Sequence, residues 1–226
     1  MRELLKTALP ALTAEQLDRF ETYYRLLIDW NTRMNLTTIT EPEDVVNKHF
    51  VDSLAALPYL GEKDRIIDVG TGAGFPGVPL LILRPTLKVT LLDGLQKRIT
   101  FLEALLDALG LKARMIHMRA EDAGKDPGLR GKFDAATTRA VAPLPVLLEL
   151  TVPLLKVGGQ TIAYKGNVQE ELAGAQGAAK QLFTELSAVE CPASYGARTL
   201  ILGKKTAATP ARFPRKAGTP AKAPLA

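Results

Sequence analysis

Apolar residues in the first 60 positions recur at helical spacing. One stripe comprises Leu17, Phe20, Tyr24, Leu27 and Ile28, and a second comprises Val45, Val46, Phe50, Leu54 and Leu57. Residues three or four apart lie on one face of a helix, so each stripe predicts an amphipathic helix. Helix-start patterns precede both stripes, at 13–16 and 40–43. Residues 1–60 carry no strand pattern and predict a helical cap packed beside the rest of the chain.

From residue 64 the pattern changes to short apolar strands that alternate with helical stretches. The expected strands are 65–69, 88–92, 113–118, 133–137 and 160–164, and the expected helices are 75–83, 96–109, 144–155 and 168–182. Such alternation predicts an α/β fold with a doubly wound, Rossmann-like parallel sheet. Two further strands, 183–189 and 198–202, lie close enough to pair antiparallel. That closing hairpin is typical of class I methyltransferase sheets, and we assign 61–203 to this domain.

The charge of the chain is concentrated in its last 23 residues. The 226 residues carry a net charge of +5, and positions 204–226 hold six basic residues and no acidic one. Four prolines stand among the alanines and threonines of this tail. Such a composition cannot build a core of its own, so we expect 204–226 to be disordered. Two roles remain open for it: a cationic arm for phosphate backbones, or a solubilising extension.

Several classes of protein fit the composition poorly. No apolar stretch is long enough to span a bilayer, and the amino terminus lacks a signal-peptide core, so we expect a cytoplasmic protein without membrane contact. Cys191 is the single cysteine and predicts a small buried hydrophobe rather than a nucleophile. His49 and His117 are the only histidines, which argues against a metal site.

The segment 68–77, Asp-Val-Gly-Thr-Gly-Ala-Gly-Phe-Pro-Gly, carries the clearest chemistry. Gly70, Gly72 and Gly74 follow the first expected strand and let the backbone turn sharply beneath a ligand. Asp93 ends the next strand, where a carboxylate accepts hydrogen bonds from a ribose diol. Together these residues predict a pocket for a nucleoside cofactor at the carboxyl edge of the sheet.

The glycine pattern alone does not choose between cofactors. Asp68, two residues before the first glycine, and the pair Ala120 and Glu121, after the third strand, favour S-adenosylmethionine, with the latter pair at the adenine. Pro76 and Pro79 lack the N–H groups that a pyrophosphate requires. A nicotinamide-dependent oxidoreductase and a turn without a ligand remain as alternatives.

Basic residues follow the later strands. Arg139 opens onto the pocket after the fourth strand, either in an ion pair or gripping the cofactor or a substrate guanine or phosphate. Lys165 and Arg198 stand where they could meet a phosphate backbone, and Lys97 and Arg98 begin a helix at the pocket rim. We therefore expect these four residues to bind RNA, although cations on helix surfaces are usually solvated.

Two residue pairs in the cap have the spacing of helix neighbours. Asn31 and Asn35 are four residues apart, and His49 and Asp52 are three apart. Hydrogen bonds between packed helices explain both pairs more simply than catalysis does. They could order the cap over the cofactor.

Spaced motifs along residues 20–203 resemble the bacterial glucose-inhibited division protein B family. The motifs are Trp30-Asn-x-x-x-Asn-Leu-Thr37, His49-x-x-Asp-Ser53, Asp68-Val-Gly-Thr-Gly-x-Gly-x-Pro-Gly77, Leu91-Leu-Asp93 with Lys97-Arg98, Thr138-Arg-Ala140 and Lys165-Gly166. Several motifs in the right order are far more specific than the glycine loop alone. The tail extends beyond this pattern, so the resemblance says nothing of its role.

The resemblance implies a methyltransferase that uses S-adenosylmethionine, releases S-adenosylhomocysteine and needs no metal. Its substrate would be 16S ribosomal RNA or the assembling small subunit, methylated at N7 of a guanine (guanine 527 in the 530 loop), by a monomer. The cofactor contacts implied are Gly70, Phe75, Ala120, Glu121 and Arg139. Methyl transfer to N7 needs no covalent intermediate and no general base, because that nitrogen carries a lone pair and no proton. A non-catalytic RNA-binding module is a further alternative.

Overall fold

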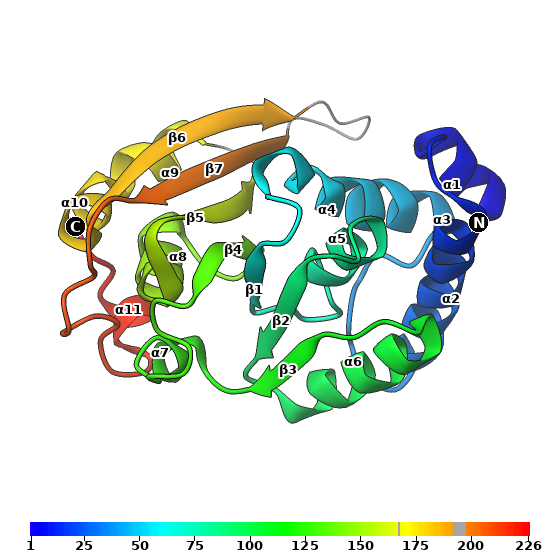
Figure 1. Cartoon of the computed structure of the whole chain (residues 1–226), viewed down its shortest axis with the longest axis horizontal. Coiled ribbons are helices and arrows are strands. Elements are labelled where there is room, and N and C mark those ends of the chain that lie inside the picture. Colours follow the sequence, from blue (N-terminus) through cyan, green and yellow to red (C-terminus); the bar gives the residue numbers. More distant parts are fainter. Residues whose placement is uncertain (167, 192–197) are drawn as a thin grey trace.

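The computed structural model describes residues 1–166, 168–191 and 198–226, and shows a twisted sheet flanked by helices (Figure 1). The strands lie in the order β3-β2-β1-β4-β5-β7-β6. Their bounds are β1 Arg65–Val69, β2 Lys88–Asp93, β3 Arg114–His117, β4 Phe133–Arg139, β5 Leu155–Lys165, β6 Thr184–Cys191 and β7 Arg198–Lys205. The order reverses direction between β1 and β4, which is where open α/β sheets bind ligands.

The pairing of the strands confirms the expected mixture of directions. β1 pairs parallel with β2 on one side and with β4 on the other, so that Asp68 stands opposite both Leu91 and Thr137. β5 and β6 both pair antiparallel with β7, which forms the closing hairpin. The segment 192–197 between β6 and β7 lies outside the described residues.

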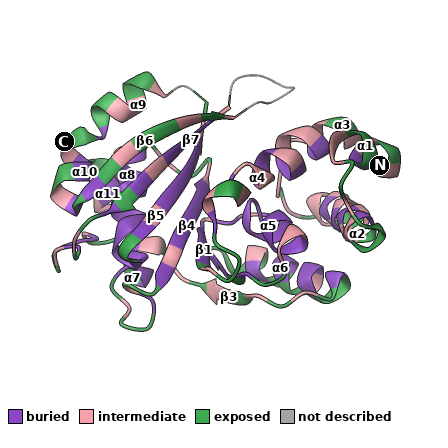
Figure 2. Cartoon of the chain, turned by 45° about the horizontal axis from the view of Figure 1, so that its top comes forward, coloured by how far each residue is buried: buried purple, intermediate pink, exposed green. Residues whose placement is uncertain are grey.

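Helices follow the strands as the alternation predicts, and the central strands are buried (Figure 2). The helices after β1 are α5 Gly77–Leu83, α6 Gln96–Leu109, α7 Ala120–Ala123, α8 Leu144–Thr151, α9 Gln169–Gly174, α10 Gln176–Leu182 and α11 Thr219–Lys222, with a 3-10 turn at Val152–Leu154. Gly110, in the left-handed region at φ 61°, ends α6 as a C-cap. In the parts of the chain that the structure describes, no helix is long and apolar enough to cross a membrane.

The cap comprises α1 Arg2–Ala8, α2 Ala14–Asn31, α3 Pro42–Val45, a π-helical turn Val46–Val51, α4 Asp52–Leu54 and a 3-10 turn Leu57–Tyr59. The predicted capping box is present: the Gln16 N–H donates to Thr13 Oγ1, and the Thr13 N–H donates to Gln16 Oε1. Phe20, Tyr23 and Phe50 are fully buried and belong to the same hydrophobic cluster as β1, β2, α5 and α6. The cap therefore shares its core with the sheet.

The expectation that Asn31 and Asn35 share a helix face is wrong. α2 ends at Asn31, whose Oδ1 accepts hydrogen bonds from the Leu36 and Thr37 N–H groups at 2.8 and 3.0 Å. This side chain holds the next turn of the chain instead of packing against a neighbouring helical residue. Asn35 lies beyond the helix end.

The tail differs from its expected disorder. Phe213 is buried, and Arg130 donates from its guanidinium to the carbonyls of Thr209, Pro210 and Phe213 at 2.7–3.2 Å. The Arg215 guanidinium forms a bidentate pair with the fully buried Glu149 carboxylate of α8. Composition indicated correctly that 204–226 has no core of its own. The segment instead packs against α7, α8 and α10.

Candidate active site

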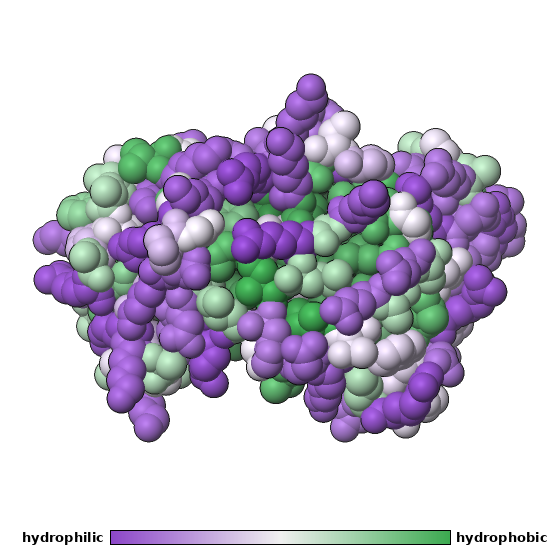
Figure 3. Space-filling view, turned by 60° about the horizontal axis from the view of Figure 1, so that its bottom comes forward, coloured by the Kyte–Doolittle hydropathy of each residue, from purple (hydrophilic) through white to green (hydrophobic). Residues whose placement is uncertain are grey.

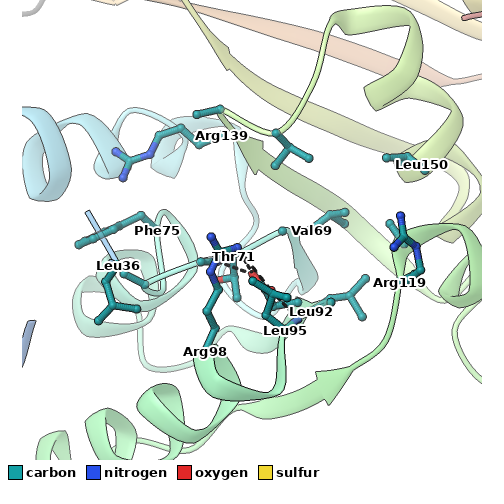
Figure 4. A pocket seen from close by; sticks show the side chains of 18 of the residues that line it. Leu36, Val69, Thr71, Phe75, Leu92, Leu95, Arg98, Arg119, Arg139 and Leu150 are labelled. Carbon is teal, nitrogen blue, oxygen red and sulfur yellow. Dashed lines mark hydrogen bonds and ion pairs between the residues drawn. The ribbon is translucent and has the colours of Figure 1, made fainter. Parts of the chain in front are cut away.

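A cavity of about 570 Å³ lies at the carboxyl edge of the strands (Figure 4). Its walls come from the loop after β1, from the ends of β2 and β4, from 118–121 after β3, and from the cap. Hydrophobic side chains gather at the centre of this side of the molecule and hydrophilic ones frame them (Figure 3). Leu95 and Val141, two of the few large apolar side chains exposed in the described chain, line the cavity.

The glycine loop is held mainly by hydrogen bonds from its N–H groups to the end of β2. Gly70 and Gly72 adopt φ values of 70° and 61°, in the left-handed region. The N–H groups of Gly70 and Thr71 donate to the Leu92 carbonyl, and the Gly72 N–H donates to Asp93 Oδ2 at 3.0 Å. A Cβ on Gly70 would lie 2.7 Å from the Val141 side chain. Since these donors are already used, the loop offers a close-fitting surface rather than a cradle of N–H groups for a pyrophosphate.

Asp68 and Gly74, predicted cofactor contacts, do not line the cavity. The fully buried Asp68 carboxylate accepts hydrogen bonds from Thr71 Oγ1, Thr137 Oγ1 and the Gly77 N–H at 2.6–3.0 Å. Burial raises the pKa of Asp68 to about 6. It therefore ties β1, β4 and the start of α5 together behind the loop.

Gly74 is required by packing of the cap rather than by a ligand. Its φ is 97°, and a Cβ there would lie 2.7 Å from the Tyr23 hydroxyl. That hydroxyl donates to the Ala73 carbonyl at 2.6 Å. Gly74 thus lets a buried cap tyrosine reach the backbone of the loop.

Asp93 stands where the sequence predicts it, at the end of β2 and in the cavity wall. Its carboxylate accepts from the N–H groups of Gly72 and Leu95 and pairs with Arg98 Nη1 at 3.1 Å. The Arg98 side chain is about one-third exposed, whereas that of Asp93 is buried. Arg98, predicted to meet RNA, lines the cavity beside Asp93. Lys97 is exposed and lies outside the cavity lining.

Ala120 and Glu121 line the opposite end of the cavity, at the start of α7. Glu121 Oε1 accepts from the Gly218 N–H at 2.9 Å, so the tail braces this wall. Glu121 Oε2 lies 3.7 Å from Arg119 Nε. We call 118–121 together with Leu150 the tail end of the cavity.

Arg139 is held by the cap. Its Nη1 donates to the Lys48 carbonyl at 3.0 Å and to Asp52 Oδ2 at 2.9 Å, and its Nη2 lies 3.1 Å from His49 Nδ1. The guanidinium also lies over the Phe75 ring, 5.0 Å from its centroid. The ion pair considered for Arg139 is therefore present. The side chain also lines the cavity, so its contact with a cofactor or a substrate stays a prediction.

His49 lines the cavity and Asp52 lies behind it, which the motif spacing did not reveal. The Asp52 carboxylate is buried and also accepts from Arg198 Nε, joining the cap to β4 and β7. His49 stacks on Phe75 at 4.5 Å, and its Nε2 lies 2.8 Å from Thr37 Oγ1. Burial, and then the Arg139 charge, lower the pKa of His49 to about 4. We call Leu36, Thr37, His49 and Arg139 the cap end of the cavity.

Two further cations expected to meet RNA are engaged inside the protein. Lys165 Nζ donates to the Ala142 carbonyl and to Glu171 Oε1, both at 2.8 Å, and Arg198 pairs with Asp52. Neither lines the cavity. Leu36, Thr37, Leu95, Val141 and Leu150 line it without having been predicted as site residues. For Thr37, its place in the Asn-x-x-x-Asn-Leu-Thr motif was the available signal.

No group of three or more metal-binding side chains occurs in the described residues. The side chains and loops around the cavity offer hydrogen bonds, one buried ion-pair network and a close-fitting shape.

Residues 16–200 match the family model described as rRNA small subunit methyltransferase G (GidB). Ribosomal RNA small subunit methyltransferase G of Desulfitobacterium hafniense is 49% identical over 219 residues, covering 95% of this chain and 91% of the relative. The protein of the same name from Geobacillus thermodenitrificans is 47% identical over 222 residues, covering 95% and 93%. The family model ends before the tail, as predicted, whereas the two relatives at 95% coverage align with part of it.

Solved structures share the fold at low identity. A putative O-methyltransferase from Klebsiella pneumoniae aligns with a TM-score of 0.58 at 14% identity, covering 91% of this chain and 96% of that one. A methyltransferase from Pyrococcus furiosus aligns with a TM-score of 0.57 at 16% identity, covering 83% and 98%. These likenesses show a class I methyltransferase fold.

Proposed function

The chain belongs to the rRNA small subunit methyltransferase G (GidB) family, and we propose that it transfers a methyl group from S-adenosylmethionine to N7 of a guanine in 16S ribosomal RNA. The substrate would be free RNA or the assembling small subunit, which places the protein in the cytoplasm. The names of the relatives support small-subunit ribosomal RNA as the substrate. The family resemblance supports N7 of a guanine as the atom that is methylated.

The observation that carries the proposal is one cavity that brings the glycine loop, Asp93 and the pair Ala120 and Glu121 together. Asp93 would take the ribose diol, the wall at Ala120 and Glu121 the adenine, and the loop at Gly70 and Gly72 the amino-acid end. The loop N–H groups donate to Leu92 and Asp93, which suits a cationic ligand better than a pyrophosphate. This arrangement and the comparisons give the oxidoreductase alternative no support.

When bound, the cofactor supplies an electrophilic methyl group, and the chain supplies alignment. Guanine N7 presents an in-plane lone pair and no proton, so no residue has to act as a base. The cap end fits a reaction without a base, because both ring nitrogens of neutral His49 are engaged by Arg139 and Thr37, and Arg139 is held by Asp52. Holding nitrogen, methyl and sulfur in line is worth roughly 7–11 kcal/mol in well-oriented reactions.

The guanine has to leave its stack to reach the cavity. Leu95 and Val141 expose apolar surface at the cavity, which suits the face of an extruded base. Of the four cations predicted to meet RNA, Lys97 is the one that remains exposed and without an ion pair among the described contacts, and we keep it in the proposal.

The test offers radiolabelled S-adenosylmethionine to small-subunit RNA and to small-subunit particles, and maps the label by cleavage at methylated guanine. We expect label at a single guanine. Asp93→Ala should weaken binding of S-adenosylhomocysteine by about 10–100-fold, because the variant can no longer accept two ribose hydrogen bonds on a carboxylate. Lys112→Ala, an exposed change outside the cavity, serves as the control. RNA binding without methyl incorporation would instead support the RNA-binding module.

A further inference from the structure

The hydroxyl of Thr37 has an unusual hydrogen-bond environment at the cap end of the cavity. Arg139 Nη2 can only donate, so its neighbour His49 Nδ1 has to accept. His49 therefore carries its proton on Nε2 and donates it to Thr37 Oγ1 at 2.8 Å. The Ile39 N–H donates to the same oxygen at 3.0 Å.

These two bonds use both acceptor sites of the hydroxyl. A hydroxyl has two lone pairs and one proton, so Thr37 Oγ1 has only its proton left to offer. Thr37 lines the cavity. Asp52, Arg139 and His49 thus turn a group that could donate or accept into a fixed donor on a residue that lines the cavity.

The place of this donor follows from the order of the strands. With adenine at the end of β3 and ribose at the end of β2, the reacting methyl lies toward β1 and β4, next to Phe75 and Arg139. His49 stacks on Phe75 from the cap side and carries the hydrogen bond to Thr37. The donor is therefore at the end of the cavity where the substrate base has to enter.

We propose that Thr37 is a specificity-determining residue whose hydroxyl donates to O6 of the target guanine. Guanine presents N7 and O6 as neighbouring acceptors on one edge, whereas adenine presents N7 beside an amino donor. A hydroxyl that can only donate pairs with O6 and leaves the adenine amino group unsatisfied. This inference rests on the proposed function and adds the reason why the enzyme takes guanine.

The test exchanges the target base in small-subunit RNA, by ligation of a synthetic segment, for inosine or 2,6-diaminopurine. Inosine retains O6, and diaminopurine carries an amino group there, while both retain N7. We expect the wild type to methylate inosine much like guanine and diaminopurine about 10–100-fold more slowly, measured as kcat/KM. Thr37→Val should lower kcat/KM about 10–100-fold on guanine and little on diaminopurine, so that the variant no longer prefers guanine.

Thr37→Ser retains the hydroxyl and should restore the preference. Thr37→Val should leave the affinity for S-adenosylhomocysteine within about twofold of the wild type, because its hydroxyl is assigned to the base and not to the cofactor. A preserved guanine preference in Thr37→Val overturns the inference. So does a large loss of S-adenosylhomocysteine affinity, which would assign the hydroxyl to the cofactor. Failure of the proposed function is seen separately, as absence of methyl incorporation by the wild type.

Discussion

The two ends of the cavity are held in place by different means. At the cap end, side chains form a chain of polar contacts from Asp52 through Arg139 and His49 to Thr37. At the tail end, a main-chain N–H of Gly218 and a docked segment brace the short helix α7. The cap end rests on the buried carboxylate of Asp52, whereas the tail end is held by the docked segment 204–226.

The difference shows how one pocket can separate two tasks. A buried network fixes the direction of a hydrogen bond, because each member has a single way to satisfy its neighbours. A docked segment fixes the position of a wall but sets no such direction. We therefore expect changes at the cap end to alter substrate choice, and changes at the tail end to alter cofactor affinity.

The largest expected effect is at Asp52. Asp52→Ala removes the buried carboxylate that two guanidiniums share, and should lower the free energy of unfolding by about 3–5 kcal/mol. Denaturant unfolding measures it. Asp44→Ala, which removes an exposed pair with Lys48, is the matched control and should cost about 0–1 kcal/mol. Equal losses in the two variants would contradict the view that the cap end is held by buried charge.

The next effect is a pH dependence that comes from His49. The pKa of His49 falls from its usual 6.5 to about 4 in the folded protein, so the unfolded chain binds the extra proton between these values. This contribution to stability is present above pH 6.5 and is lost as the pH falls toward 4. It amounts to about 3 kcal/mol. His49→Gln should remove it, so the stability difference between wild type and variant should shrink on acidification; a constant difference would exclude His49.

A smaller effect is expected at Arg215. Arg215→Ala removes the guanidinium that pairs with buried Glu149, while the backbone N–H of residue 215 still donates to that carboxylate. The loss of unfolding free energy should be about 2 kcal/mol, the contribution of hydrogen bonds to a charged group, with weaker binding of S-adenosylhomocysteine and an unchanged preference for guanine. Calorimetry and methylation assays measure these quantities. Arg212→Ala, which changes an exposed neighbour, is the control. An altered base preference in Arg215→Ala would contradict the view that the tail end affects cofactor affinity alone.

The smallest effect concerns the exposed cations of the tail. Arg212, Lys216 and Lys222 are exposed in the docked segment. If they bind RNA phosphates, their joint replacement by alanine should reduce the slope of log affinity against log salt by about one for each phosphate that is no longer neutralised. Binding of S-adenosylhomocysteine should not change. An unchanged slope would leave 204–226 with a role in structure only.

The sequence was most informative where local pattern and position in the fold agree. Strand alternation and the glycine loop located Gly70, Gly72, Asp93 and the wall at Ala120 correctly in the cavity. Asp68 and Gly74 belong to the same motif but do not line the cavity: the Asp68 carboxylate turns inward among β1, β4 and α5, and Gly74 packs against a cap tyrosine. A motif therefore predicts the loop, and only packing decides which of its residues face the ligand.

Contacts between distant segments were beyond the reach of local patterns. Arg215 pairs with Glu149 across 66 positions, and Arg139 meets the cap across about 90. Composition predicted a disordered tail, because it could not indicate the surface at Arg130 and Glu149 on which 204–226 docks. The role of Thr37 depends on a histidine tautomer that is set by Arg139, which requires the assembled structure.

Asp52 also fixes the cap to the sheet. Because its buried carboxylate binds the ends of two strands to the cap, lifting the cap would separate opposite charges away from water, which is costly. Cap and sheet should therefore move as one unit when the cavity takes up or releases a ligand.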